Sequence, residues 1–154
     1  MGWFFGFKLH LICNEKGELL NFMITPGDVD DRKPLECKAF IEFLYGKLVA
    51  DKGYIGWNIF QRLFVDGIQI VTKLKSNMKG ALMNVSDRLL LRKRAIIETV
   101  NDELKNIAQV EHSRHRSFDN FIVNILGAIA AYCMFPKKPC INVQRTLDTQ
   151  LAFF

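Results

Sequence analysis

The chain has 154 residues, of which 49% are hydrophobic and 24% are charged, and its formal net charge is +5. This length gives one domain of ordinary size, and the composition excludes an intrinsically disordered chain. Its four cysteines form no CxxC pair, and its first residues do not have the cationic region followed by an apolar region that is typical of a secretion signal. A cytoplasmic protein with free thiols is therefore expected.

The first half of the chain predicts a hairpin followed by a helix. Residues 4–13 and 18–25 are strand-like, and Asn14 to Gly17 between them are good turn residues. A helix should then start after Asp30 or Asp31 and end before Gly46. Its expected buried face consists of Leu35, Phe40, Phe43 and Leu44.

The middle of the chain predicts strands that alternate with helices. The apolar run 48–50 reads as a buried strand that stops at Asp51, and a helix is expected over residues 56–66. A further strand should follow over residues 68–74. This order implies a mixed sheet with parallel members linked through helices. The inward-facing residues expected on the helix are Ile59, Phe60, Leu63 and Phe64.

The positive charge is concentrated between Val71 and Arg94. Seven Lys or Arg stand there against one acid, Asp87, so this belt carries +6 and the rest of the chain about −1. A local belt of cations suits a DNA phosphate backbone, although the solvated face of a loop and helix is the alternative. The belt residues expected to contact DNA are Lys73, Lys75, Lys79, Arg92, Lys93 and Arg94.

Residues 91–105 predict a helix with two opposed stripes. At about 100° per residue, Arg94, Glu98, Asn101 and Lys105 share a polar face. The simplest interpretation of that face is a solvated surface with an ion pair from Arg94 to Glu98. The apolar stripe opposite consists of Ile96, Val100, Leu104 and Ile107.

The last third of the chain predicts one buried helix and a tail. Residues 121–135 are the most apolar stretch, but they fall short of the roughly 20 residues of a membrane span, so no membrane partner is expected. The preceding segment EHSRHRSFDNF offers Arg114 and Arg116 for phosphate. Residues 1–135 are therefore expected to form the domain, and residues 136–154 a loosely attached tail.

Several motifs, taken in order, resemble the bacterial insertion-sequence transposases of the DDE class. These motifs are GFKLHLI near the start, TPGDVDDR, VADKGY around Asp51, and the helix signature in which Arg94, Glu98 and Lys105 have the family's spacing. Leu91 stands where the family has a tyrosine. The resemblance covers nearly the whole chain. It implies a ribonuclease H-like α/β fold, a mixed sheet flanked by helices.

The resemblance also implies a reaction and its site. DDE transposases cut and join DNA, and two Mg²⁺ or Mn²⁺ ions held by carboxylates stabilise the attacking and leaving oxygens. Asp51 and Glu98 would be the catalytic metal ligands, lying close enough to share a site, while Arg94 and Lys105 would hold phosphate or steady Glu98. The partner would be DNA at the ends of an insertion sequence, and a homo-oligomer is compatible with this role.

The family's first catalytic aspartate has no counterpart in this sequence. It belongs to a strand that precedes the segment resembling GFKLHLI, in the middle of the sheet. Only Met1, Gly2 and Trp3 stand there, so we expect an amino-terminally truncated domain that lacks its first strand, is inactive alone and is marginally stable. Two functions stay open: a catalytic transposase domain, and a non-catalytic DNA-binding or inhibitory fragment of such an enzyme.

Overall fold

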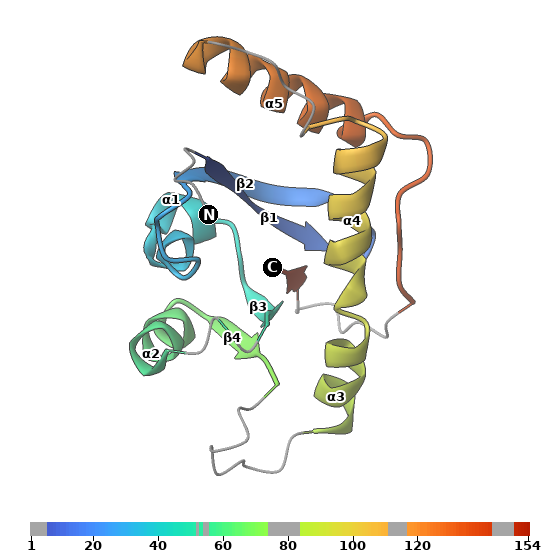
Figure 1. Ribbon diagram of the computed structural model, residues 1–154. Coiled ribbons are helices and arrows are strands. Elements are labelled where there is room, and N and C mark those ends of the chain that lie inside the picture. Colours follow the sequence, from blue (N-terminus) through green and yellow to red (C-terminus); the bar gives the residue numbers. More distant parts are fainter. Residues whose placement is uncertain (1–5, 52, 54–55, 74–83, 111–116, 143–149) are drawn as a thin grey trace, which may run out of the picture.

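The computed structural model describes residues 6–51, 53, 56–73, 84–110, 117–142 and 150–154. The chain forms five strands and several helices around one sheet (Figure 1). In chain order the elements are β1 Phe7–Asn14, β2 Leu19–Pro26, the 3-10 helix η1 Lys33–Glu36, α1 Lys38–Ile41, β3 Gly46–Val49, α2 Trp57–Val65, β4 Ile68–Val71, α3 Val85–Arg92, α4 Ala95–Asn106, α5 Phe118–Cys133 and β5 Leu151–Phe153.

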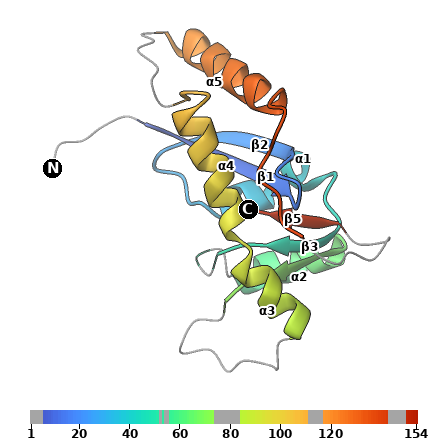
Figure 2. The same ribbon diagram turned by 90° about the vertical axis from the view of Figure 1, so that its right-hand side faces the viewer.

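The sheet is mixed, with the strand order β2-β1-β5-β3-β4. β1 runs antiparallel to β2 and to β5, whereas β3 runs parallel to β4 and to β5. Among the described strands, β5 alone joins the hairpin to the β3–β4 pair (Figures 1 and 2).

Helices cover both faces of the sheet, because alternate strand residues point to opposite faces. On one face Val49 and Phe153 pack with α3, α4 and Tyr132 of α5. On the other face Leu48 and Ala152 pack with η1, α1 and α2. The expected fold class, a mixed α/β sheet flanked by helices, is confirmed.

The hairpin turn forms as its residues predict. The Asn14 side-chain oxygen accepts hydrogen bonds from the backbone N–H groups of Lys16 and Glu18, both at 3.0 Å. Gly17 has a φ of +69°, a conformation that glycine adopts without a Cβ clash. The asparagine and the glycine therefore fix the reversal between β1 and β2.

The helix expected over residues 91–105 is two helices that meet at Lys93 and Arg94. The N–H of Lys93 still bonds to the Leu89 carbonyl, but the N–H groups of Ile96 and Ile97 bond only three residues back, to Lys93 and Arg94. The turn tightens there and α4 starts at Ala95. The stripe expected to be buried is confirmed at Ile96, Val100 and Leu104, whereas Ile107 follows the helix and is 61% exposed.

Two of the expected inward faces are partly wrong. The helix expected before Gly46 is divided into η1 and α1 by Cys37, which has extended backbone. The spacing of a single continuous helix is therefore lost, and Phe43 is 75% exposed. On α2 Ile59 and Leu63 are buried, but Phe60 and Phe64 are exposed, because a helix on one face of a sheet buries only one stripe.

The loosely attached tail expected over residues 136–154 is wrong where the structure describes it. The N–H of Ile141 donates to the Glu15 carbonyl at 2.9 Å, and Lys93 donates to the carbonyl of Asn142. Leu151 and Phe153 are 4% and 0% exposed in the middle of the sheet. The local sequence does not indicate this strand, because its pairing partners lie more than a hundred residues away in the chain.

α5 is a one-faced helix rather than the fully buried one that its apolar sequence predicts. It buries Ile125, Ala128, Ile129 and Tyr132. Val123 and Leu126 point outward, at 67% and 45% exposure. No helix in the described part of the chain is long and apolar enough to cross a membrane.

Candidate functional site

Asp51 follows β3 at the carboxyl end of the sheet's parallel strands. β3 ends at Val49, and the N–H of Ala50 continues the pairing by donating to the Val71 carbonyl at 3.1 Å. Asp51 then leaves the sheet and is half-buried. Carboxyl ends of parallel strands are where ligands gather in open α/β sheets, so this position is suited to a functional carboxylate.

Glu98 lies in the first turn of α4, and its side chain is 61% exposed. The Arg94 guanidinium donates to its Oε1 at 2.9 Å. The predicted ion pair is therefore present, and it holds Glu98 on the face of α4 opposite its buried stripe. An exposed i,i+4 pair of this kind adds only about 0.3–0.5 kcal/mol to stability.

Asp51 and Glu98 both flank residues that share one core. Val49, two residues before Asp51, and Val100, two residues after Glu98, belong to the same buried cluster between the sheet and α4. Val49 itself points to the α4 side of the sheet, and Asp51 follows it two residues later, after the chain has left β3. This packing brings β3 and α4 together; the predicted sharing of one metal site by the two carboxylates stays a prediction.

The strand between β1 and β3 supplies no acid. β5 consists of Leu151, Ala152 and Phe153 and is followed by Phe154. Among the described residues no three His, Cys, Asp or Glu side chains come together to hold a metal ion. Asp51 and Glu98 have the hard oxygen ligands that Mg²⁺ prefers, and Glu98 is paired with Arg94.

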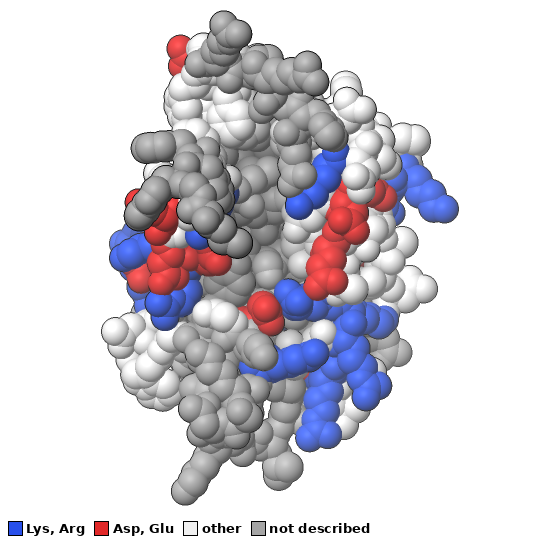
Figure 3. Space-filling view, in the orientation of Figure 1, with Lys and Arg blue, Asp and Glu red and all other residues white. Residues whose placement is uncertain are grey.

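Cations gather on α3, beside the acidic side chains of α4 (Figure 3). Lys73 after β4, and Arg88 and Arg92 on α3, are exposed and form no ion pair with any residue that the structure describes. Arg88 is one of the seven cations of the belt, but the sequence pattern predicts no helix there and so does not indicate it as a DNA contact. Arg88 and Arg92 offer positive charge to a ligand on the α3–α4 side of the sheet, and Lys73 adds an exposed cation after β4.

Other predicted DNA contacts have different placements. Lys93 is half-buried and donates to the Asn142 carbonyl, so it holds the chain's later segment against the α3–α4 junction. Lys105 is exposed near the end of α4. The remaining predicted contacts, Lys75, Lys79, Arg114 and Arg116, lie outside the described residues.

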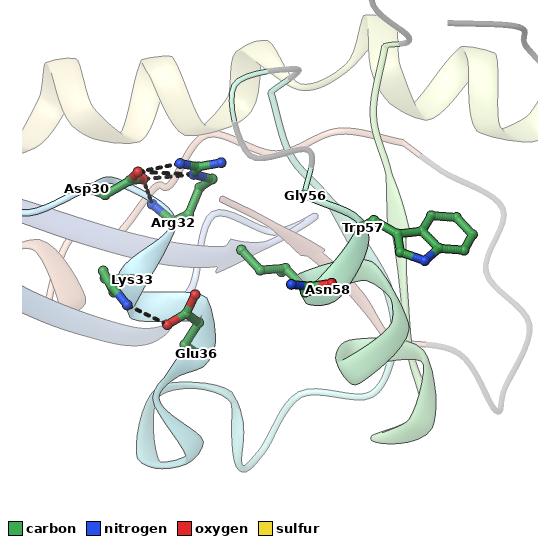
Figure 4. Close-up of a pocket in the computed structure, with 8 residues that line it drawn as sticks. Asp30, Arg32, Lys33, Glu36, Gly56, Trp57 and Asn58 are labelled. Atoms are coloured by element: carbon green, nitrogen blue, oxygen red, sulfur yellow. Dashed lines mark hydrogen bonds and ion pairs between the residues drawn. The ribbon is translucent and has the colours of Figure 1, made fainter.

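A pocket of about 360 Å³ opens between η1 and the start of α2 (Figure 4). Its charged groups pair with one another: Arg32 with Asp30 at 2.5 Å and Lys33 with Glu36 at 2.9 Å. Hydrogen bonding from Arg32 holds the pKa of Asp30 well below its usual range. The Trp57 ring points away from the Asp30–Arg32 pair. The pocket therefore has no excess charge with which to attract phosphate or metal.

His10 is a buried titratable residue that no sequence motif indicates as functional. Its Nε2 lies 2.8 Å from the Thr25 hydroxyl across the β1–β2 ladder, and its ring stacks on Phe154. Burial lowers the pKa of His10, more than the nearby Asp31 raises it. A neutral imidazole that joins two strands is a structural role for this residue.

The family described as the transposase DDE domain matches residues 1–118. The chain belongs to this family. Searches of curated proteins and of solved structures gave no match. The five-stranded mixed sheet with helices on both faces is that of a ribonuclease H-like DDE domain. The matched region holds β1 to β4 and α3 to α4, with Asp51 and Glu98, whereas most of α5 and all of β5 lie beyond it.

Proposed function

We propose that this DDE domain acts on DNA in transposition, binding duplex DNA across α3 and the start of α4 and presenting Asp51 and Glu98 as two of the acids of a divalent-metal site. The 154-residue chain does not cleave or transfer DNA by itself. One observation carries this second statement: the strand between β1 and β3 is β5, which has no carboxylate.

Two features support DNA as the partner. The exposed cations Arg88 and Arg92 belong to α3, which packs on the same face of the sheet as α4, the helix that carries Glu98, and exposed Lys73 follows β4. The pocket at η1, by contrast, has its charges neutralised internally. No base-reading module is evident in the sequence, so binding should depend on phosphate charge and show little sequence preference.

The binding experiment compares two charge reversals that change net charge equally. Arg92→Glu removes an exposed cation from the last turn of α3, and Arg62→Glu does the same in the last turn of α2, on the other face of the sheet. With labelled duplex DNA, Arg92→Glu should weaken affinity by about tenfold near 0.1 M salt. It should also make the slope of log binding constant against log salt concentration shallower by about one. Arg62→Glu should leave both nearly unchanged. Equal losses in the two variants would mean that net charge, not this surface, binds DNA.

A triple reversal tests the rest of the belt. Replacing Lys73, Lys75 and Lys79 with Glu should abolish most duplex binding. If the triple variant binds as tightly as the parent chain at the same salt, the belt is a solvated surface.

The catalytic part of the proposal is tested with Mg²⁺ or Mn²⁺ and DNA that carries the element's ends. The chain alone should give no strand transfer, and a chain extended at its amino end by a strand ending in aspartate should gain it. If the unextended chain carries out strand transfer, and Asp51→Ala abolishes it, then the chain already supplies all the carboxylates of the metal site and this part of the proposal is wrong. If the extended chain binds the ends but stays inactive, the alternative of a non-catalytic DNA-binding or inhibitory fragment is the better description.

A further inference from the structure

The position between β1 and β3 is only partly filled by β5. β5 pairs with Lys47, Leu48 and Val49 of β3, but with only Cys13 and Asn14 of the eight-residue strand β1. On its other side β1 pairs with β2 from Phe7 to Cys13. Within the described residues, the β5-facing edge of β1 from Phe7 to Ile12 therefore has no partner strand.

This edge lacks the features that usually protect an exposed strand from pairing. It contains no proline, and Lys8, its single charged residue, is held in an ion pair with Asp31 at 2.8 Å. Buried Leu11 and Ile12 fix the strand in place, whereas Phe7 at its start is 45% exposed. Unpaired N–H and C=O groups on such an edge are a template for another strand.

The register defines which strand would fit. Phe153 lies level with both Val49 and Cys13, and the N–H of Phe154 donates to the Val49 carbonyl at 3.0 Å. A strand that follows the path of β5 and continues for several more residues would pair with β3 first and then with the rest of β1. Its first residue beyond the position of Phe154 would lie level with Asp51.

We propose that the slot between β1 and β3 accepts an extended strand of another polypeptide in exchange for β5. The partner strand is longer than β5, has apolar residues on both faces to match the two cores, and runs parallel to β3 and antiparallel to β1. A carboxylate one residue beyond the position of Phe154 would stand beside Asp51. This last point rests on the proposed function, whereas the exchange itself rests only on the sheet.

The exchange is tested by adding a synthetic strand to the full chain. The probe is a fluorescein-labelled peptide with the sequence QLAFFDVTVK, which repeats residues 150–154 and continues with an aspartate and alternating residues. The control is the same peptide with proline in place of its alanine, because proline removes a ladder N–H and is excluded from central strands. Binding is followed by anisotropy, and hydrogen exchange reports on each strand.

The probe should bind saturably, and the proline control at least tenfold more weakly. On binding, amide exchange should become at least tenfold faster in residues 150–154 and slower in residues 7–12. Ala152→Pro in the chain, which weakens the resident strand, should tighten probe binding about tenfold; Leu151→Ala gives the same direction if the proline variant does not fold. Equal binding of both peptides, or unchanged exchange in residues 150–154, would overturn the proposal. A dimer of the chain that the probe does not dissociate would also overturn the proposal, because a second copy of the chain would then occupy the position between β1 and β3.

A second peptide distinguishes the displacement of β5 from the contribution of the peptide's carboxylate to metal binding. The aspartate of the probe is replaced by asparagine, which keeps size and hydrogen bonding but removes the charge. Both peptides should displace β5 equally, and only the aspartate form should raise Mn²⁺ affinity of the chain, at least tenfold. Displacement without a difference in Mn²⁺ affinity would count against the proposed function and the carboxylate position, but not against the exchange.

Discussion

The substitution Phe153→Ala tests whether β5 is a core strand of this domain. Phe153 is fully buried and pairs with Val49 on one side and Cys13 on the other. Truncating a buried phenylalanine to alanine removes its transfer free energy and leaves a cavity, and together these cost about 3–5 kcal/mol. At about 2–4 °C per kcal/mol for a domain of this size, the melting temperature should fall by roughly 6–20 °C.

The assay is thermal and urea unfolding followed by circular dichroism, with Phe43→Ala as the matched control. Phe43 is 75% exposed, so the same truncation there should cost under about 0.5 kcal/mol. If Phe153→Ala is as mild as the control, β5 is not part of the cooperative core and is not the strand that holds the position between β1 and β3. A loss confined to Phe153→Ala would show that the chain's late segment stabilises the whole sheet.

Three further predictions concern α5, α3 and the buried thiol. Tyr132→Phe removes a hydroxyl that donates to the turn-glycine carbonyl at 2.6 Å, and should lower the free energy of unfolding in urea by about 1 kcal/mol, more than any exposed tyrosine would. Asp87→Ala breaks the 2.6 Å pair with Lys47 and leaves a half-buried cation, so unfolding should become easier by about 1–3 kcal/mol; a loss that vanishes in high salt would contradict this. Burial raises the pKa of Cys13 to about 12, so at pH 8 iodoacetamide should label exposed Cys133 and spare Cys13 by peptide mass spectrometry. The folded state favours the protonated thiol, so this contribution to stability is complete below about pH 9 and declines toward pH 12. The urea midpoint should therefore fall with pH in the parent, and fall less in Cys13→Ala, where only other groups such as Tyr132 contribute.

The sequence predicted what depends on local patterns. The hairpin turn follows from Asn14 and Gly17, and the buried stripe of α4 follows from the spacing of Ile96, Val100 and Leu104. The Arg94–Glu98 pair could be predicted because residues four apart on a helix are neighbours.

The sequence did not predict what depends on distant partners. Nothing local marks Leu151 to Phe153 as a central strand, since their pairing with β1 and β3 is decided by tertiary structure. Phe60 and Phe64 look like core residues by type alone, yet they are exposed because only one stripe of α2 meets the sheet. Whether Asp51 and Glu98 share a metal also depends on tertiary placement and stays a prediction.

The late position of β5 has a consequence for synthesis on the ribosome. The hairpin and the β3–β4 pair are complete once Val71 has emerged, but the strand that joins them is made about 80 residues later. At 5–20 residues per second, the sheet stays in two pieces for roughly 4–16 seconds, with the facing edges of β1 and β3 open. During that interval a nascent chain is exposed to neighbours on the same messenger RNA, and its yield of soluble protein should depend on translation rate and chaperone supply.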